Sequence, residues 1–576
     1  MAVEHTRAAA AAPVAGWQSG YAAACKAVDA GSIPTPASSD FPSPTARRTD
    51  SERPRTLGVV PDTLMSDNLY TLIERGGAQP HRPFMVLGEG RAWTYGELFA
   101  WAGRIATVLA DLGVRPGDRV AVQVEKSPQA VMLYLACLRA GAVFLPLNPA
   151  YTAAELDYFL SDAQPALFVC RPQDRAVARE LATRRGIPHV ESMDADGSGS
   201  LLAAAGAALP DFATVGRSRD DLAAILYTSG TTGRSKGAMI THGNLASNAR
   251  TLMQAWRFDG ADVLIHALPI FHVHGLFVAL NVPLLAGASL LFRAKFDAEE
   301  VLRLLPLASV LMGVPTFYVR LLQQPALDRR STANMRLFVS GSAPLLAETH
   351  TAWRARTGHA ILERYGMTET GMLTSNPYQG ERVAGTVGPP LPGVELRIAS
   401  LDSGALLPRG EVGVIEVRGP NVFKGYWRMP DKTNAEFRDD GFFVTGDVGL
   451  IDARGYVHIV GRAKDIIISG GFNVYPKEVE TEIDAILGVA ESAVIGLPHA
   501  DLGEGVTAVV VRKSGAVLDE PLVLDRLRQR LAKYKLPKRI VFADDLPRNA
   551  MGKVEKRALR ERYAALYRPD GNSSAE

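Results

Sequence analysis

The segment from residue 222 to residue 241 constrains this chain more than any other. An apolar, strand-like run ends at Tyr227, residues 228–237 read Thr-Ser-Gly-Thr-Thr-Gly-Arg-Ser-Lys-Gly, and a second strand-like run follows. Glycines let backbone N–H groups approach an anion, hydroxyl groups donate further hydrogen bonds, and Lys236 adds a positive charge. The segment therefore predicts a strand–loop–strand unit whose loop binds phosphate.

Three other interpretations of this loop fit its residues less well than phosphate binding does. A Walker loop requires Gly-Lys after the spacer, but Ser235 or Ala238 stands at the position of that glycine. Residues 233–237 match the Gly-x-Ser-x-Gly elbow of serine hydrolases, which is a strand-to-helix turn. Because the next helix opens only near Asn244, a hydrolase using Ser235 stays a remote alternative. An ordinary Gly/Ser hairpin would leave the clustered donors and Lys236 unexplained.

Composition excludes several classes of function. The 576 residues carry 63 basic and 61 acidic side chains, so we expect no nucleic-acid partner. The three cysteines (Cys25, Cys137 and Cys170) lie far apart, which predicts neither disulfides nor structural zinc and suits a reducing, cytoplasmic compartment. The apolar stretch 273–292 contains histidine, asparagine and proline, so it predicts a buried strand–loop–helix passage rather than membrane insertion. Nothing in the sequence indicates an oligomeric state.

Alternating strand-like and helix-like segments predict an α/β fold. We expect a large N-terminal domain over 65–461, made of layered α/β subdomains and a β subdomain over 385–460. A smaller, mobile C-terminal α/β domain follows over 462–576. Residues 1–64 are rich in Ala, Pro, Ser and Thr and predict a disordered extension. A targeting segment, which would make the protein organellar, and a wrongly assigned start are the alternatives.

Three downstream segments suit the same phosphate chemistry. Thr368-Glu369 offers a hydroxyl donor beside an acidic ligand for Mg²⁺. Asp447 lies on a tight turn where its carboxylate can hold a ribose diol, and Lys553 follows a glycine in a loop near the C-terminus. Taken singly, such residues are usually helix caps, structural turns or surface lysines. Their joint occurrence and their order carry the prediction.

Together these segments resemble the acyl-activating, adenylate-forming enzymes, which include acyl-CoA synthetases, firefly luciferase and peptide-synthetase adenylation domains. The resemblance covers about residues 66–565, and residues 266–275, 312–318, 337–344, 374–378 and 385–388 resemble the malonyl-CoA synthetase branch. It implies that a carboxylate attacks the α-phosphate of MgATP to give acyl-AMP and pyrophosphate, after which coenzyme A displaces AMP. Malonate is the implied acid. Methylmalonate, a short- or medium-chain fatty acid, and a nucleotide-binding protein without catalysis are the alternatives.

The resemblance also implies a role for each matching residue. The adenylation site would comprise Thr228, Ser229, Gly230, Thr231, Thr232 and Lys236 on the β- and γ-phosphates, Gly341, Ser342, Ala343, Glu363, Arg364, Tyr365 and Gly366 around the adenine, Thr368 on phosphate, Glu369 on Mg²⁺, and Asp447 and Arg462 on the ribose. Lys553 would span the carboxylate and the α-phosphate, where charge concentrates in the transition state.

The same resemblance implies a hinge at Lys464 and a coenzyme A site at Gly470 and Gly471, because the small domain of the family turns between the two half-reactions. Malonate would keep one carboxylate free in the pocket, and burying that group requires a cation or a cluster of donors. The candidate substrate residues are His272, His274, Ser340, Ser342, Arg320 and Arg293.

Overall fold

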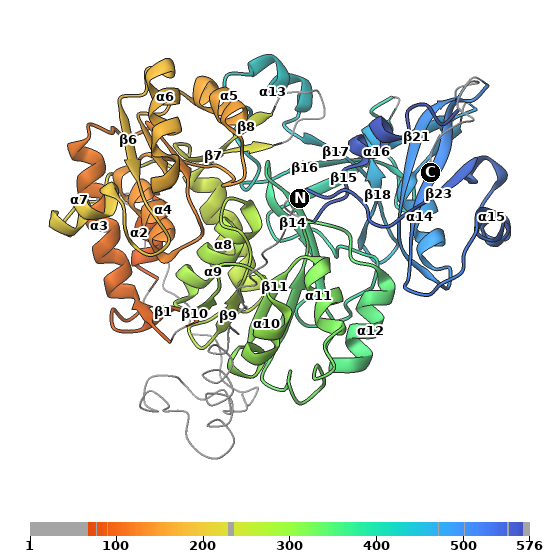
Figure 1. Ribbon diagram of the computed structural model, residues 1–576, viewed down its shortest axis with the longest axis horizontal. Helices are drawn as coiled ribbons and strands as arrows, with labels where there is room; N and C mark the ends of the chain where they lie inside the picture. Colours follow the sequence, from red (N-terminus) through yellow and green to blue (C-terminus); the bar gives the residue numbers. More distant parts are fainter. Residues whose placement is uncertain are drawn as a thin grey trace, which may run out of the picture. The chain divides into compact units, whose positions relative to one another are not determined.

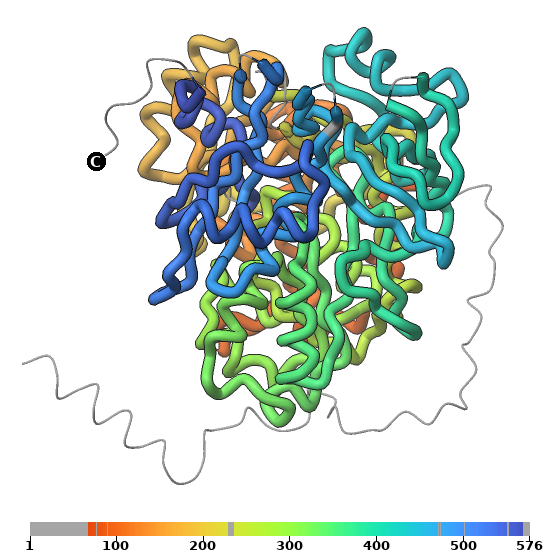
Figure 2. Tube along the Cα trace, turned by 90° about the vertical axis from the view of Figure 1, so that its right-hand side faces the viewer, coloured from red at the N-terminus to blue at the C-terminus, as the bar shows by residue number. Residues whose placement is uncertain are grey.

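The computed structural model describes residues 67–567, except 77, 89, 229–234, 402, 471, 500, 550 and 551. The predicted extension over 1–64, the loop residues Ser229, Gly230, Thr231 and Thr232, and Gly471 lie outside the described residues. The chain builds four β-sheets (Figure 1). In Figure 2 the six-stranded sheet is orange to yellow, the eight-stranded sheet mainly green, the four-stranded sheet cyan and the five-stranded sheet blue.

The six-stranded sheet carries the predicted phosphate loop at one edge. Its order is β6-β5-β3-β4-β7-β8, and every pair is parallel except the antiparallel β7–β8 hairpin. The strands are β3 (Arg119–Gln123), β4 (Val143–Pro146), β5 (Leu167–Cys170), β6 (His189–Ser192), β7 (Leu222–Thr228) and β8 (Lys236–Thr241). A strand therefore follows the loop, which contradicts a nucleophile elbow at Ser235.

The eight-stranded sheet is parallel in its centre and antiparallel at both edges, in the order β14-β13-β12-β11-β9-β10-β1-β2. Its strands are β1 (Pro83–Val86), β2 (Ala92–Thr94), β9 (Val263–His266), β10 (Ser289–Phe292), β11 (Val310–Gly313), β12 (Leu337–Ser340), β13 (Leu362–Met367) and β14 (Gly371–Ser375). The turn between β13 and β14 holds Thr368 and Glu369.

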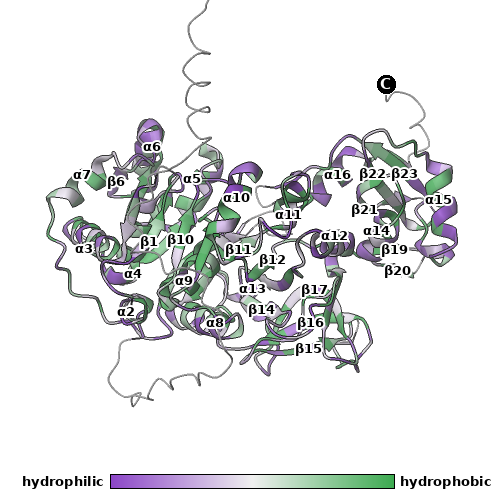
Figure 3. Ribbon diagram, turned by 90° about the horizontal axis from the view of Figure 1, so that it is seen from below, coloured by the Kyte–Doolittle hydropathy of each residue, from purple (hydrophilic) through white to green (hydrophobic). Residues whose placement is uncertain are grey.

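Helices fill the space between these two sheets and cover their outer faces. The central layer, whose buried side chains join both sheets in one core, includes α2 (Leu69–Glu74), α3 (Tyr95–Asp111), α4 (Pro128–Ala140), α8 (His242–Ala255) and α9 (Ala279–Ala286). The outer helices are α5 (Ala153–Ala163) and α6 (Arg175–Arg185) on one sheet, and α10 (Ala298–Leu304), α11 (Pro315–Leu322) and α12 (Ala347–Thr357) on the other. Figure 3 shows hydrophobic residues concentrated on the strands, as a layered core requires.

The stretch 273–292 differs from its prediction. A one-turn π-helix (His274–Val278) runs into α9, and β10 follows, so the order is helix, turn and strand rather than strand, loop and helix. Every residue of α9 but the last is buried, and so is all of β10. A fully apolar run has no periodicity that separates a buried helix from a buried strand. Among the described residues, no helix is long and apolar enough to cross a bilayer.

The β subdomain and the small domain complete the fold and confirm the predicted class. The antiparallel four-stranded sheet comprises β15 (Glu395–Ala399), β16 (Gly413–Arg418), β17 (Phe443–Ile451) and β18 (Val457–Arg462). The small-domain elements are β19 (Ile467–Ser469), β20 (Phe472–Val474), α14 (Pro476–Asp484), β21 (Val489–His499), β22 (Gly503–Arg512), α15 (Glu520–Arg528), β23 (Arg539–Ala543) and α16 (Lys556–Arg562). Helix α7 (Ser200–Ala207) and helix α13 (Pro430–Glu436) lie outside these groups.

Candidate active site

Lys236 opens β8 and points into a polar, largely buried site. The strand pairing sets it opposite Thr228 across the β-hairpin. Its Nζ atom lies 3.2 Å from Oε1 of Glu436 and 4.0 Å from the centre of the Tyr426 ring. Burial and these two partners fix the position of the ammonium group at the end of the phosphate loop.

Glu369 is held in the turn between β13 and β14. The amide of Asn248 on α8 donates to the Met372 carbonyl at 2.9 Å, and the Asn421 amide donates to the Thr370 carbonyl at 2.7 Å, so the C-terminal side of the turn is fixed. The Glu369 carboxyl group is buried, and burial raises its pKa above the usual range. A carboxylate withdrawn from water in this way favours a cation as its partner.

The residues around Glu369 fit Mg²⁺ on chemical grounds. Mg²⁺ in nucleotide enzymes is typically bound by one or two carboxylates together with phosphate oxygens and water. Within the part of the chain that the structure describes, no cluster of three or more His, Cys, Asp or Glu side chains could hold a metal ion. The single buried carboxylate of Glu369 therefore suits an ion that arrives with a phosphate group.

Asp447 and Arg462 are paired across neighbouring strands. They are register partners in β17 and β18, so Asp447 lies within a strand and not on the tight turn that the sequence predicted. Nε of Arg462 lies 2.8 Å from Oδ1 of Asp447. The hydroxyl of Tyr365 donates to the other oxygen, Oδ2. The Asp447 carboxylate raises the pKa of Arg462. Both predicted ribose residues and one predicted adenine residue thus lie together.

Lys553 of the small domain reaches this part of the large domain. Its pKa is lowered first by desolvation and then by the positive charge of Arg462, while Asp447 acts in the opposite direction. The residue is exposed to solvent, although charges of the large domain act on its ammonium group. The preceding Gly552 adopts a positive φ of 73°, and a Cβ atom there would lie 3.8 Å from Thr316 on α11.

Arg364 is a buried cation that forms no ion pair with any residue that the structure describes. Only 3% of the residue is exposed, and its Nε and Nη2 atoms have no hydrogen-bond partner among the described residues. Burial lowers the pKa of the guanidinium to about 9. The group packs against the backbone of Gly341, where an added Cβ would lie 2.5 Å from Cζ. Arg364 also lowers the pKa values of His274 and Lys553, which indicates that these groups are near it.

Two histidines and two serines lie near Arg364. Oγ of Ser342 lies 3.2 Å from Nδ1 of His274, while Nε2 of His274 and Oγ of Ser340 are buried without a partner within the described residues. Burial and then the Lys553 charge lower the pKa of His272 to about 4. Burial also lowers the pKa of His274, followed by the effect of Arg364. Both rings are therefore neutral near pH 7.

The remaining predicted residues have varied environments. Glu363 is buried, accepts a hydrogen bond from the Leu345 backbone at 3.0 Å, and has its pKa raised to about 8 by burial. Arg320 is exposed on α11. Arg293 is engaged elsewhere, because its guanidinium donates to the backbone carbonyls of Val86 and Phe292 and pairs with Glu300. This leaves Arg364 as a better-placed anion receptor than Arg293.

The last predicted residues to be placed belong to the small domain and to the candidate adenine site. Lys464 lies in the short turn between β18 and β19, and Gly470 follows β19 with a φ of 58°. The candidate adenine residues Gly341, Ala343 and Gly366 lie at the ends of β12 and β13 or just after them. The sequence motifs predicted neither Tyr426 nor Glu436 as site residues. Their signal was faint: a tyrosine beside a glycine and a glutamate ten residues later.

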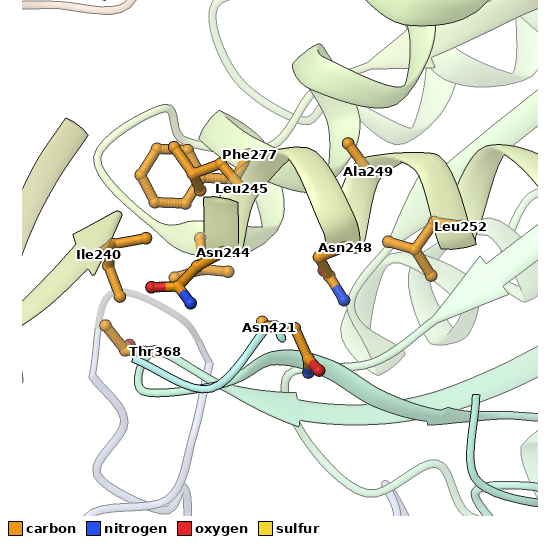
Figure 4. A pocket seen from close by; sticks show the side chains of 11 residues that line it. Ile240, Asn244, Leu245, Asn248, Ala249, Leu252, Phe277, Thr368 and Asn421 are labelled. Carbon is orange, nitrogen blue, oxygen red and sulfur yellow. The ribbon is translucent and has the colours of Figure 1, made fainter. Parts of the chain in front are cut away.

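A narrow apolar cavity opens beside Thr368. Asn244 and Asn248 of α8 face Thr368 and Asn421 across it, and Phe277 lies at its far side (Figure 4). The cavity measures about 20 Å³, which is room for about one water molecule. None of the candidate acid-binding residues lines this cavity.

Sequence and structure comparisons agree with this geometry. The profile of the AMP-binding enzyme family matches residues 73–427, and that of its C-terminal domain matches residues 478–553. The crystal structure of ATP-bound MatB from Rhodopseudomonas palustris is 60% identical, covers 88% of this chain and 100% of its own, and superposes with a TM-score of 0.86.

Two curated relatives show how the chemistry of such proteins varies. Malonate–CoA ligase of Arabidopsis thaliana is 36% identical over 523 residues, which cover 83% of this chain and 85% of that protein. Feruloyl-CoA synthase of an Amycolatopsis species is 38% identical over 497 residues, or 85% and 98% of the two chains. By its motifs, its site and these similarities, the chain belongs to the AMP-binding enzyme family.

Proposed function

We propose that this protein is an ATP-dependent acid–thiol ligase that converts malonate, ATP and coenzyme A into malonyl-CoA, AMP and pyrophosphate. One malonate oxygen attacks the α-phosphorus of ATP, and the bond to the bridging oxygen breaks as pyrophosphate leaves. The thiol sulfur of coenzyme A then attacks the acyl carbon, loses its proton, and displaces AMP. The family membership, the ATP-bound relative and the malonate–CoA ligases among its relatives support this reaction class.

In the first half-reaction, the large-domain residues hold the nucleotide. Lys236 and the loop that precedes it bind the β- and γ-phosphates, and Thr368 donates to a phosphate oxygen. Glu369 would hold Mg²⁺, which would supply positive charge to the phosphate oxygens. Asp447 accepts hydrogen bonds from the ribose hydroxyls while Arg462 holds its carboxylate in place, at 2.8 Å. Fixing the nucleotide in this way lowers the entropic cost of the reaction.

Lys553 is the residue that stabilises the transition state. Negative charge builds on the α-phosphate and on the attacking carboxylate, and an ammonium group between them offsets both. Its lowered pKa reflects an environment where burial disfavours the charged form, so an anionic substrate restores the charge. The small domain, over 462–576, would then turn about Lys464 so that Gly470 and Gly471 line the path of coenzyme A.

The observation that carries the choice of malonate is the unpartnered guanidinium of Arg364. A buried cation with two free donor atoms is costly unless an anion pairs with it. His274, Ser340 and Ser342 supply further hydrogen-bonding groups nearby. A monocarboxylate has one carboxylate and uses it in the reaction, whereas malonate has a second one for Arg364.

A substrate panel tests the proposal. Pyrophosphate release is measured with coenzyme A present, using malonate, methylmalonate, acetate, butyrate and ferulate as acids. We expect malonate to have a kcat/KM at least about a hundredfold above acetate and butyrate, because the latter leave the buried cation unpaired. Equal rates with malonate and butyrate would contradict malonate specificity. Ester hydrolysis without ATP, abolished by Ser235→Ala, would support a serine hydrolase instead.

A further inference from the structure

The two ends of the phosphate site are joined by a segment that no motif assigned. Residues 423–427 run beside β8: the Lys424 N–H donates to the Met239 carbonyl, the Met239 N–H to the Gly425 carbonyl, and the Trp427 N–H to the Gly237 carbonyl, at 2.8–3.0 Å. On its other side, the Phe423 N–H donates to the Glu369 carbonyl at 2.8 Å. The segment therefore ties the lysine strand to the metal-binding turn through the backbone.

The side chains repeat this connection. The hydroxyl of Tyr426 lies 2.7 Å from Oε2 of Glu436 and 3.1 Å from Oε1 of Glu369. The other oxygen of Glu436 lies 3.2 Å from Nζ of Lys236 and 2.7 Å from Nζ of Lys432, one turn earlier on α13. A continuous path of charge-assisted contacts thus runs from Lys236 through Glu436 and Tyr426 to Glu369. Tyr426 is 3% exposed and Glu369 is 5% exposed.

The chemistry of this path couples its ends. A tyrosine hydroxyl has one proton, so Tyr426 can donate to only one of its two carboxylates at a time. A positive charge near Glu369 favours donation of the Tyr426 proton to Glu436. A phosphate that draws Lys236 away from Glu436 strengthens this same hydrogen bond between Tyr426 and Glu436. Binding of a ligand at one end of this path therefore favours the hydrogen-bond arrangement that helps ligand binding at the other end. Burial strengthens these interactions because little water screens them.

We propose that Tyr426 and Glu436 are positioning residues that set the spacing of Lys236 and Glu369 and make binding of the triphosphate and of Mg²⁺ mutually dependent. This inference rests on the proposed function, since it assumes that Lys236 contacts phosphate and Glu369 contacts the metal. Neither residue touches the reacting atoms. Their effect should therefore appear in nucleotide and metal binding rather than in recognition of the acid.

Binding calorimetry of ATP without malonate, over a series of Mg²⁺ concentrations, tests the coupling. In Tyr426→Phe, we expect the Kd for MgATP and the half-saturating Mg²⁺ concentration each to rise about tenfold, the size expected for loss of a hydrogen bond to a charged group. Glu436→Gln should behave similarly, and the double variant should be no worse than the weaker-binding single variant, because both changes break one network. The KM for malonate should change less than threefold.

Tyr95→Phe is the matched control. This variant also removes a fully buried tyrosine hydroxyl. Tyr95 lies in α3, away from this site, and its hydroxyl donates to the Ala288 carbonyl at 2.8 Å. Its melting temperature shows the cost of that deletion alone. Unchanged MgATP and Mg²⁺ affinities in Tyr426→Phe, or strictly multiplicative effects in the double variant, would overturn the inference. Failure of the wild-type protein to bind MgATP would instead overturn the proposed function.

Discussion

At the scale of single residues, the site is marked by ionisable groups whose pKa values are shifted from their usual range. Arg364 has a lowered pKa and two donor atoms without a partner among the described residues. Glu369 has a raised pKa, whereas the pKa of Lys553, which comes from the small domain, is lowered. Such groups destabilise an empty site and favour a ligand of opposite charge. In the proposed reaction, the positive groups would face the substrate and the phosphates, and Glu369 would face the metal.

Removing the small-domain lysine should separate binding from chemistry. In Lys553→Ala, we expect the rate of adenylate formation to fall by a factor of about a hundred to a thousand, as when one preorganised charge contact is lost. The Kd for ATP should change little, because Lys236 and Asp447 remain. Single-turnover formation of malonyl-AMP and equilibrium ATP binding measure the two quantities. A variant that keeps the full rate of adenylation would exclude the assigned role of Lys553.

Glu363 predicts a pH dependence of stability. Its pKa is raised by burial to about 8 in the folded protein, whereas an unfolded chain ionises it near the usual value of 4.5. Folding therefore takes up a proton between these pH values, and the stability contributed by this group falls as pH rises through that window. We expect the loss of unfolding free energy from pH 5 to pH 8 to be smaller in Glu363→Gln. The greatest slope from one group is about 1.4 kcal/mol per pH unit.

Denaturant unfolding of both proteins at several pH values measures this difference. Groups other than Glu363 titrate equally in the two proteins, so subtraction isolates its contribution. Parallel stability curves for the two proteins would show that Glu363 ionises normally in the folded state.

At the scale of elements, tight backbone packing sets the position of the substrate histidines. The π-helix begins at His274, and a Cβ atom on Gly275 would lie 2.0 Å from the Pro269 carbonyl oxygen, so only glycine fits. His266 adds a contact between its Nε2 and the Gly275 carbonyl at 2.9 Å. The turn thus holds His274, whose pKa Arg364 lowers, in a fixed orientation.

Substituting this glycine should disturb substrate binding through the backbone. We expect Gly275→Ala to lower stability by about 2 kcal/mol or more, because the clash involves main-chain atoms that cannot move freely. The KM for malonate should rise more than the KM for ATP. Thermal unfolding and the two KM values check this result. Gly206→Ala, in the exposed part of α7 with no atom within 4 Å of the added Cβ, is the control and should not lower the melting temperature.

Much of the fold could be predicted because its signals are local. Ser127 caps α4 through its side chain, and Pro476 stands at the first position of α14; serine caps and first-turn prolines are helix-start signals that a sequence displays. The predicted order of elements over 273–292 was wrong because a uniformly buried run shows no hydrophobic periodicity.

The site was harder to predict because its central contacts join distant segments. The motifs marked Lys236, Glu369, Asp447 and Lys553, whose roles stay predictions, but they placed Arg364 only near adenine. The charged pair Glu363-Arg364 inside a buried strand was the available signal. The link from Tyr426 to Glu369 spans 57 residues, and no local pattern reports such a contact.

At the scale of the whole molecule, function depends on two domains meeting at one site. Lys553 and Gly552 belong to the small domain, while Asp447, Arg364 and Thr316 belong to the large one. A contact made by one loop can be released without unfolding either domain. This arrangement suits a reaction whose two steps need different surfaces.

Residues 1–64 should contribute little to this machinery, since their composition does not favour a packed core. We expect deletion of residues 1–64 to change the melting temperature by less than about 2 °C and kcat/KM by less than twofold, within ordinary surface effects. Thermal unfolding and steady-state kinetics of the shortened chain are the measurements. A large loss of either would contradict the predicted disordered extension.

In the proposed function, the preference for malonate depends on Arg364 as the receptor of the free carboxylate. The most direct test is the ratio of kcat/KM for malonate to that for butyrate in the wild-type protein and in Arg364→Met, which removes the charge and keeps much of the volume. We predict that this ratio falls by at least about a hundredfold, with butyrate activity retained, because only malonate loses a charge partner. An unchanged ratio, with both activities falling together, would contradict the assignment of malonate through Arg364.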